Sequence, residues 1–230
     1  MMEVRIFKNT KELSEVIIKE LIEISHYRTK CNIALSGGNT PRKIFEELSM
    51  STQINWDNLR IFWTDERCVP PDDVESNFHL AKIFLLDKIK IPEVNIYRIR
   101  GEDEPETEAT RYSNLINRKF DLIFAGIGSD GHTASIFPES DRLLNSEKNY
   151  EISFHPLSHQ ERITMTGKML LNANKIIFCV TGKDKAQIIK KISEENFNCP
   201  ASYVLKHNSN SFLYMTKDAA HFLKYQKSKI

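Results

Sequence analysis

Short apolar runs alternate along this chain with stretches in which apolar residues recur every three or four positions. Short apolar runs are typical of buried strands, and the wider spacing is typical of amphipathic helices. Strands are predicted at residues 4–7, 32–36, 59–63, 95–99, 121–126, 175–180, 201–205 and 211–215. Helices are predicted from an N-cap at Thr10 to about residue 24, and at 41–48, 76–88, 106–117 and 184–193. This alternation predicts an α/β fold, a doubly wound, mainly parallel, Rossmann-like sheet with helices on both faces.

Two segments depart from this alternation. Residues 139–162 show no clear period and are expected to form a long loop over the site. Residues 101–108, with the sequence GEDEPETE, are expected to form an acidic, solvated loop and the start of a helix. No internal repeat interrupts the pattern, so residues 1–230 are expected to form a single domain.

The composition narrows the class of protein. Of the 230 residues, 40% are hydrophobic and 27% are charged, which is typical of a soluble globular protein. A net charge of +1 gives no general attraction for nucleic acid or for an anionic membrane. The N-terminal segment lacks the apolar core of a signal peptide, and no apolar run reaches transmembrane length. We therefore expect a cytoplasmic protein. Either a monomer or a homodimer is compatible with the sequence.

The cysteines and histidines give no metal-binding spacing. Cys31 and Cys179 fall in or beside predicted strands and are expected to be small buried residues of a reduced protein. The chain has no C-x-x-C pair and no H-E-x-x-H motif, and His155 and His159 have no carboxylate motif nearby. Neither a metal nor a cofactor is expected.

The strongest chemical signal follows the predicted strand at 121–126, in the sequence GIGSDGHTASIFP. Ligands of open α/β sheets bind just beyond the carboxyl ends of the strands, and this turn lies there. His132 is of the residue type that most often acts as a general base near neutral pH, and Asp130 can fix its tautomer. Gly128 supplies backbone freedom within the turn. Alternatively, the same residues form a polar turn whose Asp caps a short helix.

A second turn, Ser36-Gly-Gly-Asn-Thr-Pro41, joins a predicted strand to a predicted helix. Thr40 is expected to cap that helix and Pro41 to open it. Backbone N–H groups in such a turn can converge on a phosphate at the positive end of the helix. The alternative, a tight connection that binds nothing, is equally compatible with this turn alone.

Charged residues follow two more strands. Asp65 and Arg67 come after the strand at 59–63, and the guanidinium of Arg67 matches the oxygens of a phosphate. An Asp65–Arg67 ion pair that holds the loop is the alternative, and the two roles are compatible. Lys185, in VTGKDK, is expected in a first helical turn, where a cation is unfavourable unless an anion binds there. Arg162, in ERITMT, is a weaker basic candidate.

In this order, SGGNTP, DERCVP with the following SN, GIGSDGHTASIFP, RITMT and VTGKDK resemble the motifs of 6-phosphogluconolactonases. The resemblance runs from about Leu35 to Lys185. It implies the fold shared with ribose-5-phosphate isomerase and glucosamine-6-phosphate deaminase. It also implies hydrolysis of 6-phospho-D-glucono-1,5-lactone to 6-phosphogluconate, the second step of the oxidative pentose phosphate pathway. By the same resemblance His132 is the general base, Asp130 supports it, and Arg67 and Lys185 hold the phosphate.

The expected site thus pairs the catalytic residues His132 and Asp130 with a set that contacts the substrate or its phosphate. That set is Ser36, Gly37, Gly38, Asn39, Thr40, Asp65, Arg67, Gly128, Arg162 and Lys185. The chain departs from the family pattern at Ile127 and Ser129, where Met and Pro are more often expected.

Other classes of protein fit less well. GIGSDG matches the G-x-G-x-x-G of dinucleotide-binding proteins, but Pro138 arrives too early for the helix that must follow. Ser36 lacks the G-x-S-x-G elbow of a serine hydrolase nucleophile. A regulator that only binds a sugar phosphate would need no base. The nearest competitor is a sugar-phosphate isomerase or deaminase; the deaminase motif continues H-I-A-F-N-E, with a carboxylate where this chain has Phe137.

Overall fold

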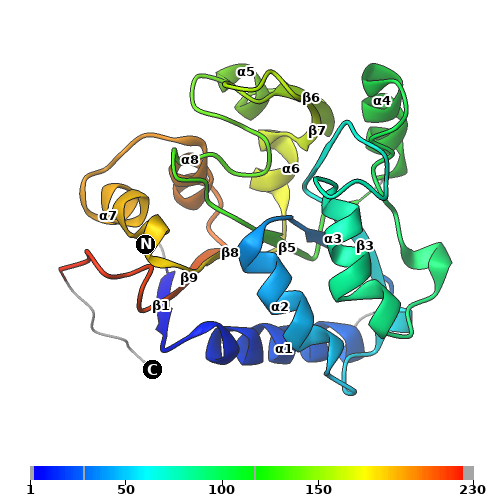
Figure 1. Ribbon diagram of the computed structural model, residues 1–230, viewed down its shortest axis with the longest axis horizontal. Helices are drawn as coiled ribbons and strands as arrows, with labels where there is room; N and C mark the ends of the chain where they lie inside the picture. Colours follow the sequence, from blue (N-terminus) through cyan, green and yellow to red (C-terminus); the bar gives the residue numbers. More distant parts are fainter. Residues whose placement is uncertain (1–2, 28, 117, 225–230) are drawn as a thin grey trace.

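The computed structural model describes residues 3–27, 29–116 and 118–224. A six-stranded parallel sheet crosses the molecule in the order β1-β9-β8-β5-β2-β3 (Figure 1). Its strands are β1 Glu3–Phe7, β2 Cys31–Leu35, β3 Leu59–Trp63, β5 Leu122–Ala125, β8 Ile176–Val180 and β9 Ser211–Thr216. Every residue of β2, β5 and β8 is buried, as expected for central strands covered on both faces.

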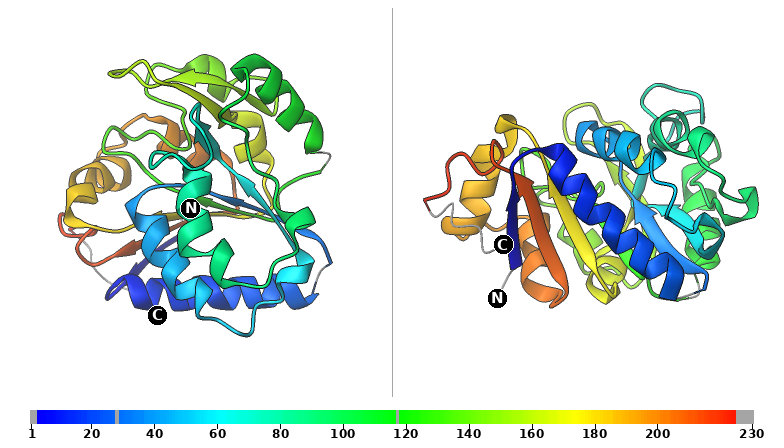
Figure 2. Two further views of the ribbon diagram at one scale, coloured as in Figure 1. Left: turned by 45° about the vertical axis from the view of Figure 1, so that its right-hand side comes forward. Right: turned by 90° about the horizontal axis from the view of Figure 1, so that it is seen from below.

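Helices cover both faces of this sheet (Figure 2). One face carries α1 Thr10–Tyr27, α2 Asn39–Ser49 and α3 Asn77–Phe84. The other carries α6 Gly167–Asn172, α7 Ala186–Glu194 and α8 Pro200–His207. The predicted doubly wound α/β architecture is confirmed.

A second, antiparallel sheet stands apart from the first, with the order β4-β7-β6. Its strands are β4 Asp65–Arg67, β6 Tyr150–Phe154 and β7 Glu161–Met165, and α4 Pro105–Leu115 packs against it. The prediction of a long loop over 139–162 is therefore wrong, because this segment holds α5 Asp141–Leu144 and the β6–β7 hairpin. The sequence does not mark β6 as a buried strand, because β6 is only partly buried and its apolar residues form no continuous run.

The predicted strand at 201–205 is also wrong, because these residues lie in helix α8. Pro200 occupies the first turn, and the backbone N–H of Cys199 donates to the Ser202 hydroxyl, which fixes the start of the helix. Ala201, Val204 and Leu205 are all buried. A helix this short and this buried gives the same apolar run as a buried strand.

The predicted strand at 95–99 is absent. Only Ile96 forms an isolated bridge, to Ile61 of β3, and the short 3-10 helix η3 Glu93–Asn95 precedes it. Other 3-10 turns are η1 Trp56–Asn58, η2 Leu86–Lys88 and η4 Lys183–Lys185. The predicted helices at 76–88 and 184–193 are thus each divided into a 3-10 turn and an α-helix.

Two predicted helix starts are wrong by one or two residues. Asn9, not Thr10, caps α1, since its side-chain oxygen accepts from the N–H of Glu12 at 3.0 Å. The N-cap of α2 is Gly38, so Thr40 lies inside the helix and Pro41 is its third residue. At the end of the predicted helix 106–117, residue 117 lies outside the described residues, and α4 ends at Leu115.

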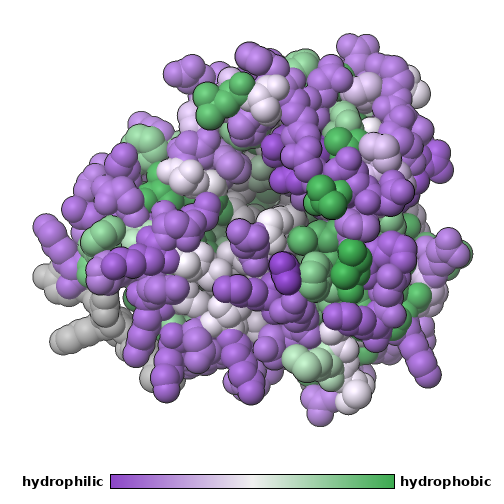
Figure 3. Space-filling model, in the orientation of Figure 1, coloured by the Kyte–Doolittle hydropathy of each residue, from purple (hydrophilic) through white to green (hydrophobic). Residues whose placement is uncertain are grey.

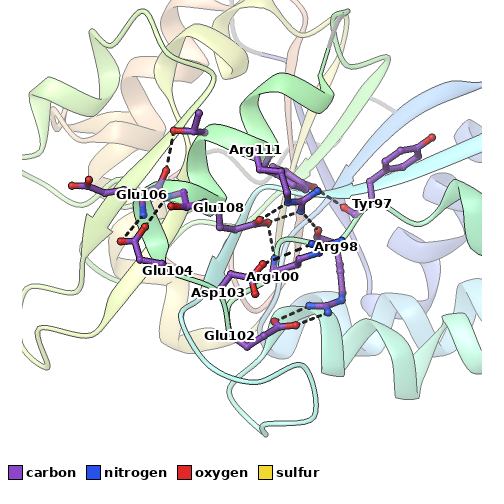
Figure 4. A network of polar contacts seen from close by, with 12 residues as sticks. Tyr97, Arg98, Arg100, Glu102, Asp103, Glu104, Glu106, Glu108 and Arg111 are labelled. Carbon is purple, nitrogen blue, oxygen red and sulfur yellow. Dashed lines mark hydrogen bonds and ion pairs between the residues drawn. The ribbon is translucent and has the colours of Figure 1, made fainter.

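The acidic segment 101–108 is only partly a solvated surface (Figure 4). Glu104 is exposed and caps α4, but Glu108 is fully buried. The Glu108 carboxylate accepts from the Arg111 side chain at 2.7 Å and from the N–H of Arg100 at 2.8 Å. Arg111 also donates to the backbone oxygen of Arg98, so the pair holds the segment that leads into α4. The prediction of surface exposure is wrong for Glu108, because charge alone does not show a buried partner.

Cys31 and Cys179 are buried, as predicted. Among the described residues, no helix is both long enough and apolar enough to cross a bilayer.

We expect Glu108→Gln to lower the free energy of unfolding by about 2 kcal/mol, since the buried carboxylate loses its charge-assisted hydrogen bonds to Arg111, whose side chain is partly exposed. Glu106→Gln, on the exposed side of the same helix, is the matched control and should stay within about 0.5 kcal/mol of wild type. Urea unfolding at pH 7 measures both. Equal effects of the two substitutions would contradict the structural role given to Glu108.

Candidate active site

The topology itself marks one place for a ligand. From β2 the chain winds outward to β3, whereas from β5 it winds the other way through β8 to β9. Ligands of doubly wound sheets bind where the winding reverses, beyond the carboxyl ends of the strands. Here that point lies between β2 and β5. A cleft of about 760 Å³ occurs there, and Figure 3 shows hydrophilic side chains around a central hollow on the face seen in Figure 1.

The structure brings almost all of the predicted site residues to this cleft. Its lining includes Ser36, Gly37, Gly38, Asn39, Thr40, Asp65, Arg67, Gly128, His132, Arg162 and Lys185. Asp130 does not line the cleft and reaches it only through His132. The lining also includes Asn77, Ala134 and Thr181, which the sequence analysis did not single out as site residues.

The turn after β2 presents backbone to the cleft. Gly37 has no space for a side chain, because a Cβ there would lie 1.7 Å from Oδ1 of Asn77. Gly38 has a φ of 103°, which glycine adopts without strain. Helix α2 then begins with no side-chain cap and no acidic residue in its first turn. Its amino end is thus open to an anion.

Thr40 has a different function from the predicted cap. Its hydroxyl lies 2.8 Å from the hydroxyl of Thr181, just after β8. This contact ties the turn after β2 to the turn that leads into η4 and Lys185. Two glycine turns from separate strands are thereby held on the same side of the cleft.

His132 and Asp130 form a hydrogen-bonded pair. Nδ1 of His132 lies 2.7 Å from Oδ1 of Asp130, and the same oxygen accepts the backbone N–H of His132 at 3.0 Å. Burial acts to raise the pKa of Asp130, but the hydrogen bond and the charge of His132 lower it to about 2. Asp130 is therefore an ionised acceptor, which favours the tautomer of His132 that carries its proton on Nδ1 and its free electron pair on Nε2.

The turn that carries His132 is fixed by its own backbone. The N–H of Gly128 donates to the oxygen of His132, and the N–H of Gly131 donates to the oxygen of Gly128. No helix follows, since the next residues form a tight turn in which Thr133 and Ile136 bridge. The helix that a dinucleotide fingerprint needs is therefore missing from this turn, as Pro138 predicted.

Two arginines face each other across the second sheet. Arg67 of β4 pairs directly with Arg162 of β7, an arrangement in which like charges repel. Burial and the charge of Arg67 lower the pKa of Arg162. The Nε atoms of both are buried, and neither has a hydrogen-bond acceptor among the described residues.

Lys185 adds a further cation to the cleft wall, which also includes Lys43 and the Glu46-paired Arg42. Within the described ranges, no carboxylate lies within ion-pair distance of Arg67, Arg162 or Lys185. These three cations without counter-ions lie beside two glycine turns. An anion bound there would reduce the repulsion between the cations and accept hydrogen bonds from their free N–H groups. The alternative Asp65–Arg67 ion pair is not formed.

The two acidic residues of the Asp65-Glu-Arg67 strand are bound by neutral donors instead. Asp65 accepts from the hydroxyls of Thr64 at 2.9 Å and Ser135 at 2.6 Å. Glu66 accepts from three backbone N–H groups and the Ser76 hydroxyl. Burial raises the pKa of Glu66, and these hydrogen bonds oppose that effect.

Glu66 also explains why Asn77 reaches the cleft. The Glu66 carboxylate accepts hydrogen bonds from the first two N–H groups of α3. The side-chain amide of Asn77 donates to the backbone oxygen of Asp65 at 2.9 Å. In the sequence, the only sign of these contacts is the Ser76-Asn77 pair that follows the acidic residues at 65–66. Asn77 is 40 residues from Gly37, so the sequence does not show that the two residues meet in the cleft.

Among the described residues, no group of three or more His, Cys, Asp or Glu side chains could hold a metal ion. Ser36 lines the cleft, but no hydrogen bond joins it to His132 in the part of the chain that the structure describes. The pairing that a serine nucleophile needs is therefore not present.

Comparison with known proteins agrees with this geometry. The family described as glucosamine-6-phosphate isomerases/6-phosphogluconolactonase matches residues 8–213. A 6-phosphogluconolactonase from Aggregatibacter actinomycetemcomitans is 39% identical over 228 residues, covering 94% of this chain and 98% of that protein.

Solved structures show the same relationship. One described as devB protein superimposes with a TM-score of 0.91 at 34% identity and covers 97% of this chain and 100% of its own. A monomeric glucosamine-6-phosphate deaminase superimposes with a TM-score of 0.86 at 21% identity, over 96% and 99% of the two chains, which is a similarity of fold. The chain belongs to the glucosamine-6-phosphate isomerase/6-phosphogluconolactonase family.

Proposed function

We propose that this protein hydrolyses 6-phospho-D-glucono-1,5-lactone to 6-phosphogluconate, the second step of the oxidative pentose phosphate pathway. The observation that carries the proposal is the oriented His132–Asp130 pair in the same cleft as three cations without counter-ions. The pair supplies a base and the cations suit a phosphate monoester. The printed name of the 39% identical relative supports the same substrate.

In this mechanism His132 activates water. Asp130 holds the Nδ1 proton, so Nε2 takes a proton from a water molecule as its oxygen attacks C1 of the lactone. The carbonyl oxygen becomes an oxyanion in a tetrahedral intermediate. When the bond between C1 and the ring oxygen breaks, the His132 imidazolium returns its proton to that oxygen, which leaves an open-chain carboxylic acid.

The oxyanion needs hydrogen-bond donors, and three of the backbone amides near His132 are already engaged. The amides of Gly128, Gly131 and His132 already donate within their own turn. We therefore propose that donors come from the other backbone amides at the cleft wall, in the turn at 36–40 or beside Gly128.

The phosphate is held away from the reacting carbon. Arg67, Arg162 and Lys185, together with the open amino end of α2, would bind it and so fix C1 relative to His132. Asp65 would contribute by orienting neighbours, because both of its oxygens already accept hydroxyl protons.

Deamination or isomerisation of a sugar phosphate is the competing reaction within the family. Here the ring of Phe137 is buried and its centroid lies 4.9 Å from that of His132. An apolar ring in this place cannot relay a proton, whereas hydrolysis by activated water needs one acid–base group. Glu139 is exposed and outside the cleft lining.

We expect the purified protein to accelerate the opening of freshly made 6-phosphogluconolactone well beyond its spontaneous rate. It should release no ammonia from glucosamine 6-phosphate and should not isomerise sugar phosphates. Parallel assays of acid release and ammonia release measure both activities. Ammonia release at a rate comparable to lactone hydrolysis would show that the functional assignment is wrong.

We expect His132→Ala to lower kcat by about 10²- to 10⁴-fold while substrate binding persists, since this is the usual contribution of a general base. Asp130→Asn should lose less if it only orients the ring, and as much if it also stabilises the imidazolium. Steady-state kinetics measure the loss. His155→Ala is the control, because that ring packs edge-on against Phe137 and does not line the cleft. A near-normal rate for His132→Ala would remove the base assignment.

We expect Arg67→Ala and Lys185→Ala each to cost roughly 1.5–3 kcal/mol in kcat/KM, as one charge-assisted contact to the phosphate is lost. The same variants should turn over unphosphorylated glucono-1,5-lactone at nearly the wild-type rate. Lys183→Ala, in the same turn but outside the cleft lining, is the control for Lys185. Equal losses on both lactones would assign the residue to structure or catalysis instead of phosphate recognition.

A further inference from the structure

Ser135 is fully buried and is bound to all three strands of the second sheet. Its N–H donates to the hydroxyl of Thr164 in β7 at 3.0 Å, and its hydroxyl donates to Asp65 in β4 at 2.6 Å. Its backbone oxygen accepts from the hydroxyl of Ser153 in β6. Ser135 is three residues after His132, so these bonds join the turn of the base to the sheet that carries Arg67 and Arg162.

The turn needs such an anchor. Ala134, between His132 and Ser135, has a φ of 49°, a left-handed conformation that costs free energy for any residue with a Cβ. Ala134 also lines the cleft. A strained residue persists where its surroundings hold it, and the bonds of Ser135 are the nearest such restraint.

The hydroxyl of Ser135 also stands between two opposite charges. Nη1 of Arg162 donates to it at 3.4 Å, and it donates in turn to Oδ2 of Asp65. In the described part of the chain, Arg162 and Asp65 form no direct ion pair. The carboxylate is therefore satisfied by a neutral donor, and the guanidinium keeps its charge and its unpartnered Nε for another anion.

We propose that Ser135 is a positioning residue for phosphate recognition, a hydroxyl spacer that keeps Asp65 from neutralising Arg162. The inference rests on the proposed function and adds a residue that acts through Arg162. If the hydroxyl is removed, Oδ2 of the buried Asp65 loses its donor, and the Arg162 guanidinium, which donates to the same hydroxyl, is a strong donor for it. An Asp65–Arg162 pair would then compete with the substrate phosphate for the same N–H groups.

The test compares Ser135→Ala with Ser153→Ala. Ser153 is the cross-strand neighbour of Arg162, but Ser153→Ala removes only the hydrogen bond to the backbone oxygen of Ser135 and none made by Asp65 or Arg162, so it reports general loosening of the turn. For Ser135→Ala we expect KM for the phosphorylated lactone to rise about tenfold, with turnover of unphosphorylated glucono-1,5-lactone nearly unchanged. For Ser153→Ala any loss should be equal on both lactones. Equal losses on both lactones for Ser135→Ala would overturn the proposal.

A double-mutant cycle separates action through Arg162 from other effects. In an Arg162→Ala background, Ser135→Ala should cause no further loss of discrimination between the two lactones. Full additivity of the two losses would contradict the proposal. If Ser135→Ala does not fold, Ser135→Cys keeps the volume but is a poor donor, and it should show the same selective rise in KM.

Calorimetric binding of inorganic phosphate keeps this test independent of the lactonase reaction. Wild-type protein should bind inorganic phosphate, and Ser135→Ala should bind it about tenfold more weakly, whereas Ser153→Ala should not. Wild-type protein without lactonase activity but with this pattern of phosphate binding would refute the proposed function and support the spacer. Unchanged phosphate affinity in Ser135→Ala would overturn the spacer whatever the enzyme hydrolyses.

Discussion

The whole site depends on how one buried residue, Thr64, passes the chain from one sheet to the other. A buried backbone group without a partner is costly, so both polar groups of Thr64 must be satisfied. Its N–H donates to the oxygen of Leu35 at the end of β2, and its oxygen accepts from the N–H of Met165 at the end of β7. These two bonds fix the antiparallel sheet against the carboxyl edge of the parallel one. This junction brings Arg67 of β4 and Arg162 of β7 to the cleft.

This junction at Thr64 also determines the electrostatics of the cleft. It places Asp65 and Glu66 next to Arg67 and Arg162, where opposite charges would normally pair. Each carboxylate instead accepts protons from hydroxyls and backbone amides. Burial would otherwise make the charged carboxylates costly, and these donors offset that cost without consuming the cations. The cleft can therefore hold a concentration of positive charge although the net charge of the chain is only +1.

Features that depend on a few neighbouring residues could be predicted from the sequence. The strands β2, β5 and β8 are continuous apolar runs because they are buried on both faces, and the glycines after them mark the turns. Predictions failed where the pattern was not local. Residues 201–205 look like a strand because α8 is short and buried nearly all round, and β6 looks like a loop because it is only partly covered.

The sequence by itself determined the alternation of strands and helices, the turns that end the strands, and the adjacency of Asp130 and His132. These features follow from periodicity, from backbone freedom at glycine and from contacts within two residues. Only the tertiary structure decided that Arg67 faces Arg162, that Glu108 is buried, and that Ser135 lies between Asp65 and Arg162. Such contacts join residues that are far apart in the chain. Which residues meet depends on the register of the strands, and that register is set by the pairing of buried backbone groups where the two sheets meet.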